Sequence, residues 1–298
     1  MQKDSPSNQE LDKDVDIAID KDVDIDSPLQ TTARSVWNAG DVIEGLDQVA
    51  TELPVAIVFN GISHVVMMAT PKELEDFALG FSLSEGIVSA PQQVLDIEQR
   101  CVSEGIELAI NITGEAFSQL KNKRRNLTGR TGCGLCGAES LQQAKPVLEP
   151  VTSDIKISHQ ALQVAINNLQ QHQHLHQYLQ QQTGAVHAAI WCDTEGQLVL
   201  AREDVGRHNA LDKLLGAMAK QSLNANLGFI LVTSRASYEM VVKTARANVG
   251  ILAAVSAPTS LAITLAEQSQ IGLVGFSRPQ RHVIYAGQHR FSEEIKVP

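Results

Sequence analysis

The chain has 298 residues, of which 43% are hydrophobic and 19% charged, and its net charge at pH 7 is −10. This length suits two modest domains or one large one. No apolar run approaches the roughly 18 residues that a membrane-spanning helix needs, which excludes the integral membrane class. The first residues also lack a positively charged segment followed by an apolar one, so we predict a cytoplasmic protein without a secretory signal.

The acidity is concentrated at the N-terminus. Residues 1–30 carry nine acidic residues and three lysines, a net charge of −6, which leaves −4 for residues 31–298. The pattern Asp-Lys-Asp-Val-Asp-Ile occurs at residues 12–17 and again at residues 20–25. Such a charged, aromatic-free stretch cannot bury enough surface to fold, so we predict a disordered acidic tail over residues 1–35. The mildly acidic remainder does not indicate nucleic-acid binding.

Residues 36–121 are predicted to form a small α+β domain. Asn60-Gly61 separates two short apolar runs, which is the pattern of a type I′ β-hairpin. A helix is predicted from Thr70 as N-cap, with Pro71 as its first residue, through about Ser84. The strands expected of this domain cover residues 54–59, 62–67, 94–102 and 106–112.

The most informative segment is residues 129–137, which hold Cys133 and Cys136 among four glycines. Glycine tolerates positive φ and leaves backbone amides bare, so the segment predicts an exposed, pliable loop. Residues 122–157 as a whole show no sustained hydrophobic period and are predicted to be this loop and a linker. A thiol beside positive charge is biased toward the reactive thiolate, and the segment follows a basic run, Lys121, Lys123, Arg124 and Arg125.

The paired cysteines suit a nucleophilic or sulfur-carrying thiol, but three further roles stay open. The pair could be half of a zinc site, which needs two further ligands. No second CxxC is present, and Cys101 and Cys192 stand alone, so histidines would have to supply these ligands. A thioredoxin-type dithiol would follow a strand, and no strand is predicted before Cys133. A structural disulfide would fit a secreted chain better than a cytosolic one.

From residue 158 to 298 strands and helices alternate, which predicts a core domain of the α/β class. Near-continuous apolar runs such as residues 229–232 and 251–255 suit strands that are buried on both faces. Helices between the strands imply a partly parallel sheet. The predicted strands cover residues 186–192, 197–201, 228–233, 251–256, 271–276 and 282–286. One helix is predicted to start at residue 158, and three more are predicted over residues 207–220, 237–248 and 258–268.

Three strand ends of this domain carry residues suited to phosphate. They are residues 233–237, 256–260 and 276–281, the last being Phe276, Ser277, Arg278, Pro279, Gln280 and Arg281. Free backbone amides and the positive end of the helix dipole favour anions there, and arginine adds charge-assisted contacts. The hydroxyl groups could equally be helix caps. The charged residues 202–209, just before a helix, and His187 at a strand start fit either a site or a structural cluster.

These motifs together resemble the formate dehydrogenase accessory sulfurtransferase family, the FdhD proteins, from about Pro54 to Tyr285. The segments that carry the resemblance are residues 60–65, 77–81, 84–86, 129–137, 203–213 and 234–241. The resemblance implies a cytidine-deaminase-like mixed sheet with helices on both faces in the C-terminal domain. Deaminase chemistry itself is not expected, because a zinc deaminase needs H-x-E, and His187 is followed by two alanines.

The resemblance also implies a function and a site. A cysteine desulfurase would pass sulfur to Cys133 as a persulfide, with Cys136 as the accessory thiol. The sulfur would go to the molybdenum of the bis-molybdopterin guanine dinucleotide cofactor, bound as substrate at residues 276–281, before its insertion into formate dehydrogenase. The family implies a homodimer and no tightly bound metal of its own. A non-catalytic chaperone of formate dehydrogenase and a CxxC zinc or redox module are the alternatives.

Overall fold

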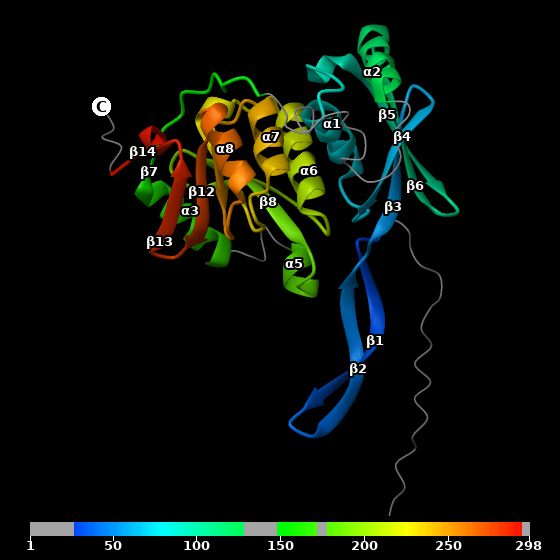
Figure 1. Cartoon of the computed structure of the whole chain (residues 1–298). Helices are drawn as coiled ribbons and strands as arrows, with labels where there is room; N and C mark the ends of the chain where they lie inside the picture. Colours follow the sequence, from blue (N-terminus) through cyan, green and yellow to red (C-terminus); the bar gives the residue numbers. More distant parts are fainter. Residues whose placement is uncertain (1–26, 128–147, 172–177, 294–298) are drawn as a thin grey trace, which may run out of the picture.

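The computed structural model describes residues 27–127, 148–171 and 178–293, without the side chains of residues 123–127 and 171. A long β-hairpin extends from a body that consists of a four-stranded sheet and a six-stranded sheet (Figure 1). The predicted CxxC segment with Cys133 and Cys136, and residues 1–26 of the predicted tail, lie outside the described residues.

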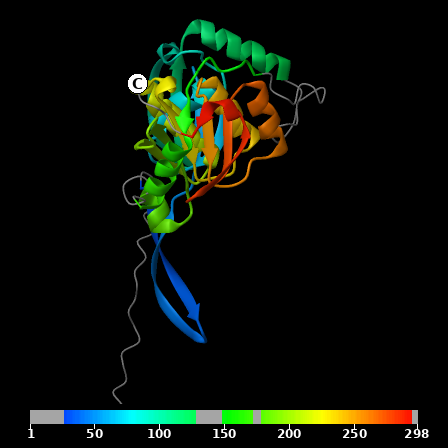
Figure 2. The same ribbon diagram turned by 90° about the vertical axis from the view of Figure 1, so that its left-hand side faces the viewer.

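The hairpin consists of β1 (Leu29–Asn38) and β2 (Asp41–Ala50), paired in register from Leu29 opposite Ala50 to Asn38 opposite Asp41. It projects away from the body in both views (Figures 1 and 2). The prediction of a disordered tail to residue 35 is therefore wrong for residues 29–35, which lie in β1. Backbone pairing stabilises this segment in place of core burial, which composition alone does not reveal.

The small domain contains a four-stranded sheet in the order β4-β3-β6-β5. All four predicted strands are confirmed, and Asn60 and Gly61 have the positive φ values, 46° and 78°, of the predicted hairpin turn. The strands β3 and β6 are parallel, and the other neighbours are antiparallel. The elements are β3 (Leu53–Phe59), β4 (Ile62–Ala69), α1 (Leu74–Ser84), η1 (Pro91–Gln93), β5 (Val94–Val102), β6 (Gly105–Ile112) and α2 (Gly114–Leu127).

The start of α1 differs from its prediction. The helix begins at Leu74 with Glu73 as N-cap, and no side chain caps it, so Thr70 is not the N-cap. The Thr70 amide donates to Asp204 Oδ2 at 3.0 Å, and its hydroxyl accepts from the Val205 amide at 3.2 Å. Contacts with the other domain therefore replace the local cap that the sequence pattern indicates.

The C-terminal domain is built on a six-stranded mixed sheet in the order β13-β12-β11-β10-β8-β9. The strands β10, β11 and β12 are parallel, and β8, β9 and β13 pair antiparallel with their neighbours. The sheet elements are β8 (His187–Asp193), β9 (Leu198–Asp204), β10 (Gly228–Val232), β11 (Ile251–Ala254), β12 (Gly272–Arg278) and β13 (Arg281–Ala286), and a separate short pair is β7 (Ile157–Ser158) with β14 (Phe291–Ser292). The strands predicted here are confirmed, with boundaries shifted by a few residues at most.

Helices cover both faces of the six-stranded sheet, as predicted. The predicted helices are confirmed, and α6 has the predicted bounds, whereas α5 and the small domain's α2 were not predicted. Because α2 runs to Leu127, the prediction of a loop and linker over residues 122–157 is wrong for residues 122–127. The described helices are α3 (His159–Gln171), α5 (Tyr178–Thr183), α6 (Arg207–Lys220), α7 (Tyr238–Arg246) and α8 (Ser260–Gln268), with the short turns η2 (Ala225–Leu227) and η3 (Gln288–Arg290). One hydrophobic cluster joins the sheet to α6, α7 and α8, and another joins its opposite face to α3.

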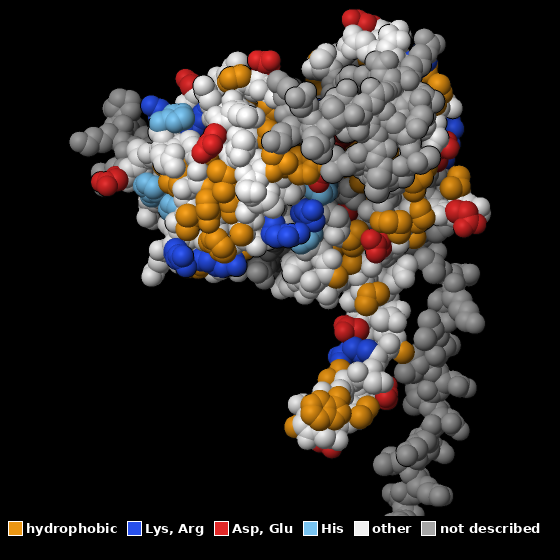
Figure 3. Space-filling view, viewed as in Figure 1, with side chains coloured by type: hydrophobic (Ala, Val, Ile, Leu, Met, Phe, Trp, Pro, Cys, Tyr) orange, Lys and Arg blue, Asp and Glu red, His pale blue; other side chains and the backbone are white. Residues whose placement is uncertain are grey.

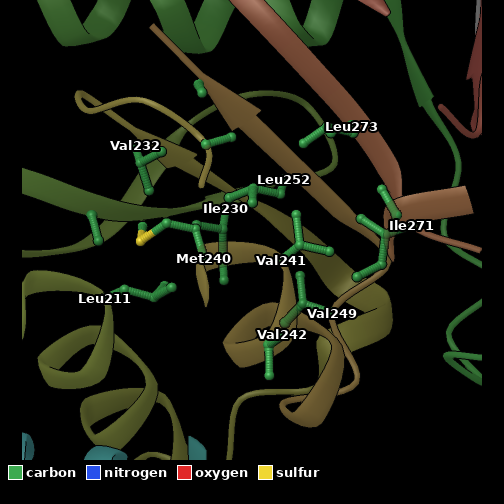
Figure 4. Packing of buried hydrophobic residues seen from close by; sticks show 14 of the residues in the cluster. Leu211, Ile230, Val232, Met240, Val241, Val242, Val249, Leu252, Ile271 and Leu273 are labelled. Atoms are coloured by element: carbon green, nitrogen blue, oxygen red, sulfur yellow. The ribbon is translucent and has the colours of Figure 1, made fainter. Parts of the chain in front are cut away.

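The first of these clusters forms the larger part of the core. Met240 and Val241 of α7 lie against Ile230 and Leu252 of the central strands (Figure 4). Each fully buried aliphatic side chain of this kind contributes about 1.5–3 kcal/mol relative to exposure. The central strands and α7 therefore form a rigid base for the loops that follow the strands.

The two domains meet where α1 crosses α6. A Cβ atom added to Gly80 would lie 1.7 Å from the Asp212 carbonyl oxygen, and one added to Gly216 would lie 1.9 Å from that of Asp76. The two glycines allow the helix backbones to approach closely, so the small domain is held firmly against the C-terminal one.

Candidate functional site

Several strand ends and helix starts meet at one edge of the six-stranded sheet. The parallel strands β10, β11 and β12 end there, and β8, which is antiparallel to β10, begins there at His187. The helices α6, α7 and α8 begin just after β9, β10 and β11 end. Their N-termini present free amides and the positive ends of helix dipoles, which favour a bound anion. We refer to this region as the strand-end edge.

The turn from β12 to β13 brings the predicted cofactor-binding residues to this edge. Arg278 and Arg281 lie opposite each other in the strand register, with Pro279 and Gln280 between them. Proline followed by a residue with positive φ, here 62° at Gln280, is the pattern of a type II turn. Phe276 also has a positive φ of 50°. Such non-glycine residues cost about 1–3 kcal/mol each, so the surrounding structure must hold them.

A pocket of about 450 Å³ lies beside this turn, between the strand ends and the helices α3 and α5. His187, Thr233, Ser277 and Arg278 give it polar groups, while Ile166 and Leu169 contribute an apolar wall. The Ser277 hydroxyl is buried and has no hydrogen-bond partner among the described residues. A buried hydroxyl without a partner is costly, so this oxygen is suited to a ligand.

His187 lies in this pocket with an unusual electrostatic environment. Burial lowers its pKa, the Arg207 guanidinium lowers it further, and Asp204 opposes the shift. The imidazole is therefore neutral at pH 7, when it can donate from one ring nitrogen and accept at the other. Its strand is tied to the neighbouring strand end, because the Ala188 amide donates to Thr233 Oγ1 at 2.9 Å.

A second group of polar side chains lies where α6 and α7 begin. His208 Nε2 lies 2.8 Å from Glu239 Oε2 and 3.3 Å from the Ser237 hydroxyl. Burial lowers the pKa of His208, the Glu239 carboxylate raises it, and Arg207 lowers it, with a net decrease. The sequence pattern indicated His208 and Ser237 as candidate site residues but not Glu239. In the sequence, Glu239 cannot be told apart from an ordinary exposed glutamate on a helix.

The charged residues 202–204 make structural contacts. Arg202 Nη2 lies 2.7 Å from Asp76 Oδ2, which ties β9 to α1. Glu203 accepts the Leu179 and Gln180 amides at the start of α5, at 2.8 and 2.9 Å. Burial raises the pKa of Glu203, and these two amides lower it. These contacts fit the ion-pair and capping alternative for residues 202–204, whereas Arg207 and His208 lie at the strand-end edge.

Arginine side chains lie along this edge. Arg235, Arg278 and Arg281 are all exposed. On the face shown in Figure 3, Lys and Arg side chains gather in two groups along the lower border of the C-terminal domain, with hydrophobic side chains between them. Guanidinium groups bind phosphate through paired, charge-assisted hydrogen bonds. Among the hydroxyl groups, that of Thr259 caps α8, accepting the Ala262 amide at 3.3 Å.

Of the two cysteines among the described residues, Cys192 is a poor candidate for the reacting thiol. Cys192 is buried in β8, and burial raises its pKa well above the usual value. Cys101 is exposed in β5. The described residues contain no group of three or more His, Cys, Asp or Glu side chains that could hold a metal ion. Within the same residues, none of the helices has both the length and the hydropathy that crossing a membrane requires.

Fold and site together define an α/β protein with a cationic strand-end edge suited to a phosphate-bearing ligand. The model of the FdhD/NarQ family matches residues 50–292, and the chain belongs to that family. The match spans both domains of the body and includes the positions of Cys133, Cys136 and residues 276–281.

Curated relatives and a solved structure agree with this assignment. The sulfur carrier protein FdhD of Cupriavidus necator is 54% identical over 275 residues, which cover 92% of this chain and 94% of that protein. The protein of the same name from Variovorax paradoxus is 51% identical over 246 residues, covering 83% and 87%. The crystal structure of a putative formate dehydrogenase accessory protein from Desulfotalea psychrophila superposes with a TM-score of 0.68 at 25% identity, covering 89% of this chain and 100% of that one.

Proposed function

We propose that this protein is a sulfurtransferase that carries a single sulfur atom to the molybdenum cofactor of formate dehydrogenase. It takes the sulfur from a cysteine desulfurase as a persulfide on Cys133, with Cys136 as the accessory thiol. One observation carries the proposal: the chain belongs to the FdhD/NarQ family over a region that includes its glycine-flanked cysteine pair. Relatives about half identical over most of the chain are named sulfur carrier proteins.

The first step is a thiol exchange. The Cys133 thiolate attacks the terminal sulfur of the desulfurase persulfide, so that a new S–S bond forms on Cys133 and the donor's S–S bond breaks. The desulfurase cysteine leaves as a thiolate, and the electrons balance without a further reductant. Positive charge near Cys133, from Arg130 and the basic residues before it, favours the thiolate that this step needs.

The strand-end edge is the proposed binding site of the sulfur acceptor. The bis-molybdopterin guanine dinucleotide cofactor would bind at Phe276, Ser277, Arg278, Pro279, Gln280 and Arg281. Three observations support this: the exposed arginines of the turn, the helix N-termini that face the same edge, and the Ser277 hydroxyl without a partner among the described residues. Molybdenum, as part of the cofactor, is the substrate of the transfer.

The comparison of two cysteine variants tests the carrier role. After incubation with desulfurase and cysteine, the wild-type protein should gain the mass of one sulfur atom on Cys133, and Cys133→Ala should gain none. Cys101→Ala is the matched control, since it removes an exposed cysteine on β5. In cells, Cys133→Ala should abolish formate dehydrogenase activity; full activity in this variant would contradict the proposal.

A non-catalytic cofactor chaperone is the second candidate. The arginines of the strand-end edge favour it, because they could bind the cofactor without any thiol chemistry. In that case the Cys133→Ala and Cys136→Ala variants would still activate formate dehydrogenase, while Arg278→Ala and Arg281→Ala would not. Metal analysis of the purified protein separately tests the zinc version of a CxxC module.

We further propose a cytidine-deaminase-like C-terminal domain, supported by the strand order β9-β8-β10-β11-β12 with β8 antiparallel to the parallel strands. The proposed organisation has an acidic tail before β1, a small α+β domain that ends with α2, a linker that carries the CxxC pair, and the core domain over residues 158–298. The active unit is proposed to be a homodimer, which sedimentation of the full chain tests directly.

A further inference from the structure

A side chain of α3 fastens the strained turn between β12 and β13. The backbone amide of Gln280, whose φ is 62°, donates to Gln163 Oε1 at 2.7 Å across 117 residues of sequence. A backbone amide can only donate. The contact therefore identifies Oε1 of Gln163 as the acceptor and leaves its Nε2 group as a donor.

This assignment determines the protonation of two histidines. Gln163 Nε2 lies 2.9 Å from His282 Nδ1, so Nδ1 must be the unprotonated nitrogen that accepts. The ring proton of His282 is then on Nε2, which lies 2.8 Å from His159 Nδ1 and donates to it. The planes of the two imidazoles are 20° apart with 5.1 Å between the ring centroids, as this hydrogen bond requires, and the Phe291 ring of β14 lies 6.1 Å from that of His159.

The hydrogen bonds run in one direction, from Gln280 to Gln163, and from Gln163 through His282 to His159. We propose that Gln163, His282 and His159 are positioning residues that hold the β12–β13 turn, and with it Arg278 and Arg281, in the geometry that binds a phosphate-bearing ligand. We call these three residues the relay. This inference rests on the proposed function of the turn. It adds that the turn binds its ligand well only while the hydrogen bonds of the relay are intact.

The relay requires both imidazoles to be neutral. A proton on His282 Nδ1 would face the amide protons of Gln163, and a proton on His159 Nδ1 would face that of His282; either places two donors against each other. Burial lowers the pKa of His282, and His159 lowers it further, which keeps the neutral form to more acidic pH. Around His282, α3 contributes His159 and Gln163, and Phe291 of β14 lies against His159. Arg281 precedes His282 in β13 and pairs in register with Arg278.

Binding of guanosine diphosphate, as a probe with guanine and phosphate groups, tests the proposal on the full chain. Gln163→Leu removes both contacts of the relay at similar size and should weaken binding about fivefold at pH 7.5. The ratio of variant to wild-type Kd should fall toward one as the pH is lowered past the ordinary imidazole pKa of about 6.5 and further into acid, because acid disables the relay in the wild type. Titration of the nucleotide itself cancels in this ratio. A ratio that stays at one, or does not change with pH, would overturn the proposal.

Gln163→Glu is the conservative variant. Its carboxylate still accepts the Gln280 amide, but it presents an acceptor to His282, which must then carry a proton on Nδ1. Binding should remain within about twofold of wild type at pH 7.5 and should resist acid better than the wild type does. If acid weakened binding to this variant as much as to the wild type, the direction assigned to the hydrogen bonds of the relay would be contradicted.

Hydrogen exchange of the Gln280 amide gives a readout that needs no ligand. Its protection factor should be high in the wild type at pH 7.5, low in Gln163→Leu, and retained in Gln163→Glu. Failure of the wild type to bind the nucleotide would contradict the proposed function of the edge and the positioning role together. Equal protection in all three proteins would contradict the relay itself, whatever the edge binds.

Discussion

The Nζ atom of Lys213 lies 2.7 Å from Oδ2 of Asp204, and both side chains are fully buried where the two domains meet. Lys213 also donates to the Thr70 carbonyl at 3.0 Å, and Asp204 accepts the Thr70 amide at 3.0 Å. A buried ion pair is tolerated only when further hydrogen bonds satisfy both ions, and Thr70 of the small domain supplies one bond to each. The pair therefore links the small domain to the first strand pair of the C-terminal one.

Lys213→Met should destabilise the protein by roughly 3–5 kcal/mol, because it leaves the Asp204 carboxylate buried without its counter-ion. Urea unfolding of the purified protein measures this loss. Lys220→Met is the matched control: Lys220 pairs with Glu75 and Asp76 but is partly exposed, so its loss should be within about 1 kcal/mol. Equal losses in the two variants would show that the buried pair has no special role.

Gly80→Ala and Gly216→Ala should each destabilise the protein by at least about 2 kcal/mol, because the new Cβ would overlap a backbone carbonyl of the facing helix. Alanine raises helix propensity by about 1 kcal/mol, which only partly offsets this. Gly114→Ala in α2 is the control, since its Cβ would meet nothing within 4 Å. Thermal unfolding distinguishes them; unchanged melting of the α1 and α6 variants would contradict the close helix crossing.

Much of the fold follows from local patterns. The helix over residues 207–220 and the hairpin at Asn60-Gly61 were predicted correctly, because periodicity and turn chemistry act within a few residues. The start of α1 was not, because Thr70 is engaged by residues more than 130 positions away. The β1–β2 hairpin was missed because its strands pair mainly with each other and bury little apolar surface.

The residues of the candidate site likewise include some that local sequence patterns predict and others that only the folded structure reveals. The place of residues 276–281 at the end of a strand could be predicted from the apolar run before them, while their role in binding phosphate stays a prediction. Gln163 could not, because nothing in its own helix distinguishes it from the other glutamines; only its contact with Gln280, 117 residues later, gives it a role. Glu239 likewise gains its meaning only from His208 on another helix.

Stability should decrease in acid, and His187 should contribute. Its pKa in the folded protein is below the unfolded value of about 6.5, so between these two values the unfolded chain binds more protons. The free energy of unfolding therefore falls as the pH drops below about 6.5. His187→Gln should make the slope of the free energy of unfolding against pH shallower in the range just below about pH 6.5. An unchanged slope would mean that His187 titrates alike in both states.

Ser277→Ala should affect ligand binding and stability in opposite directions. The Ser277 hydroxyl is buried, lines the pocket of the strand-end edge and has no partner within the described part of the chain. Removing it deletes an unsatisfied polar group, so the free energy of unfolding should stay the same or rise by up to about 1 kcal/mol.

Binding of guanosine diphosphate to Ser277→Ala should nevertheless weaken about 2- to 12-fold, the range that the loss of one hydrogen bond of about 0.5–1.5 kcal/mol gives. Calorimetric titration and urea unfolding on the same preparation measure the two quantities. Ser103→Ala, exposed in the turn between β5 and β6 of the small domain, is the control and should change neither. A Ser277→Ala protein that loses stability but binds as tightly as the wild type would assign this hydroxyl to the fold and remove it from the ligand site.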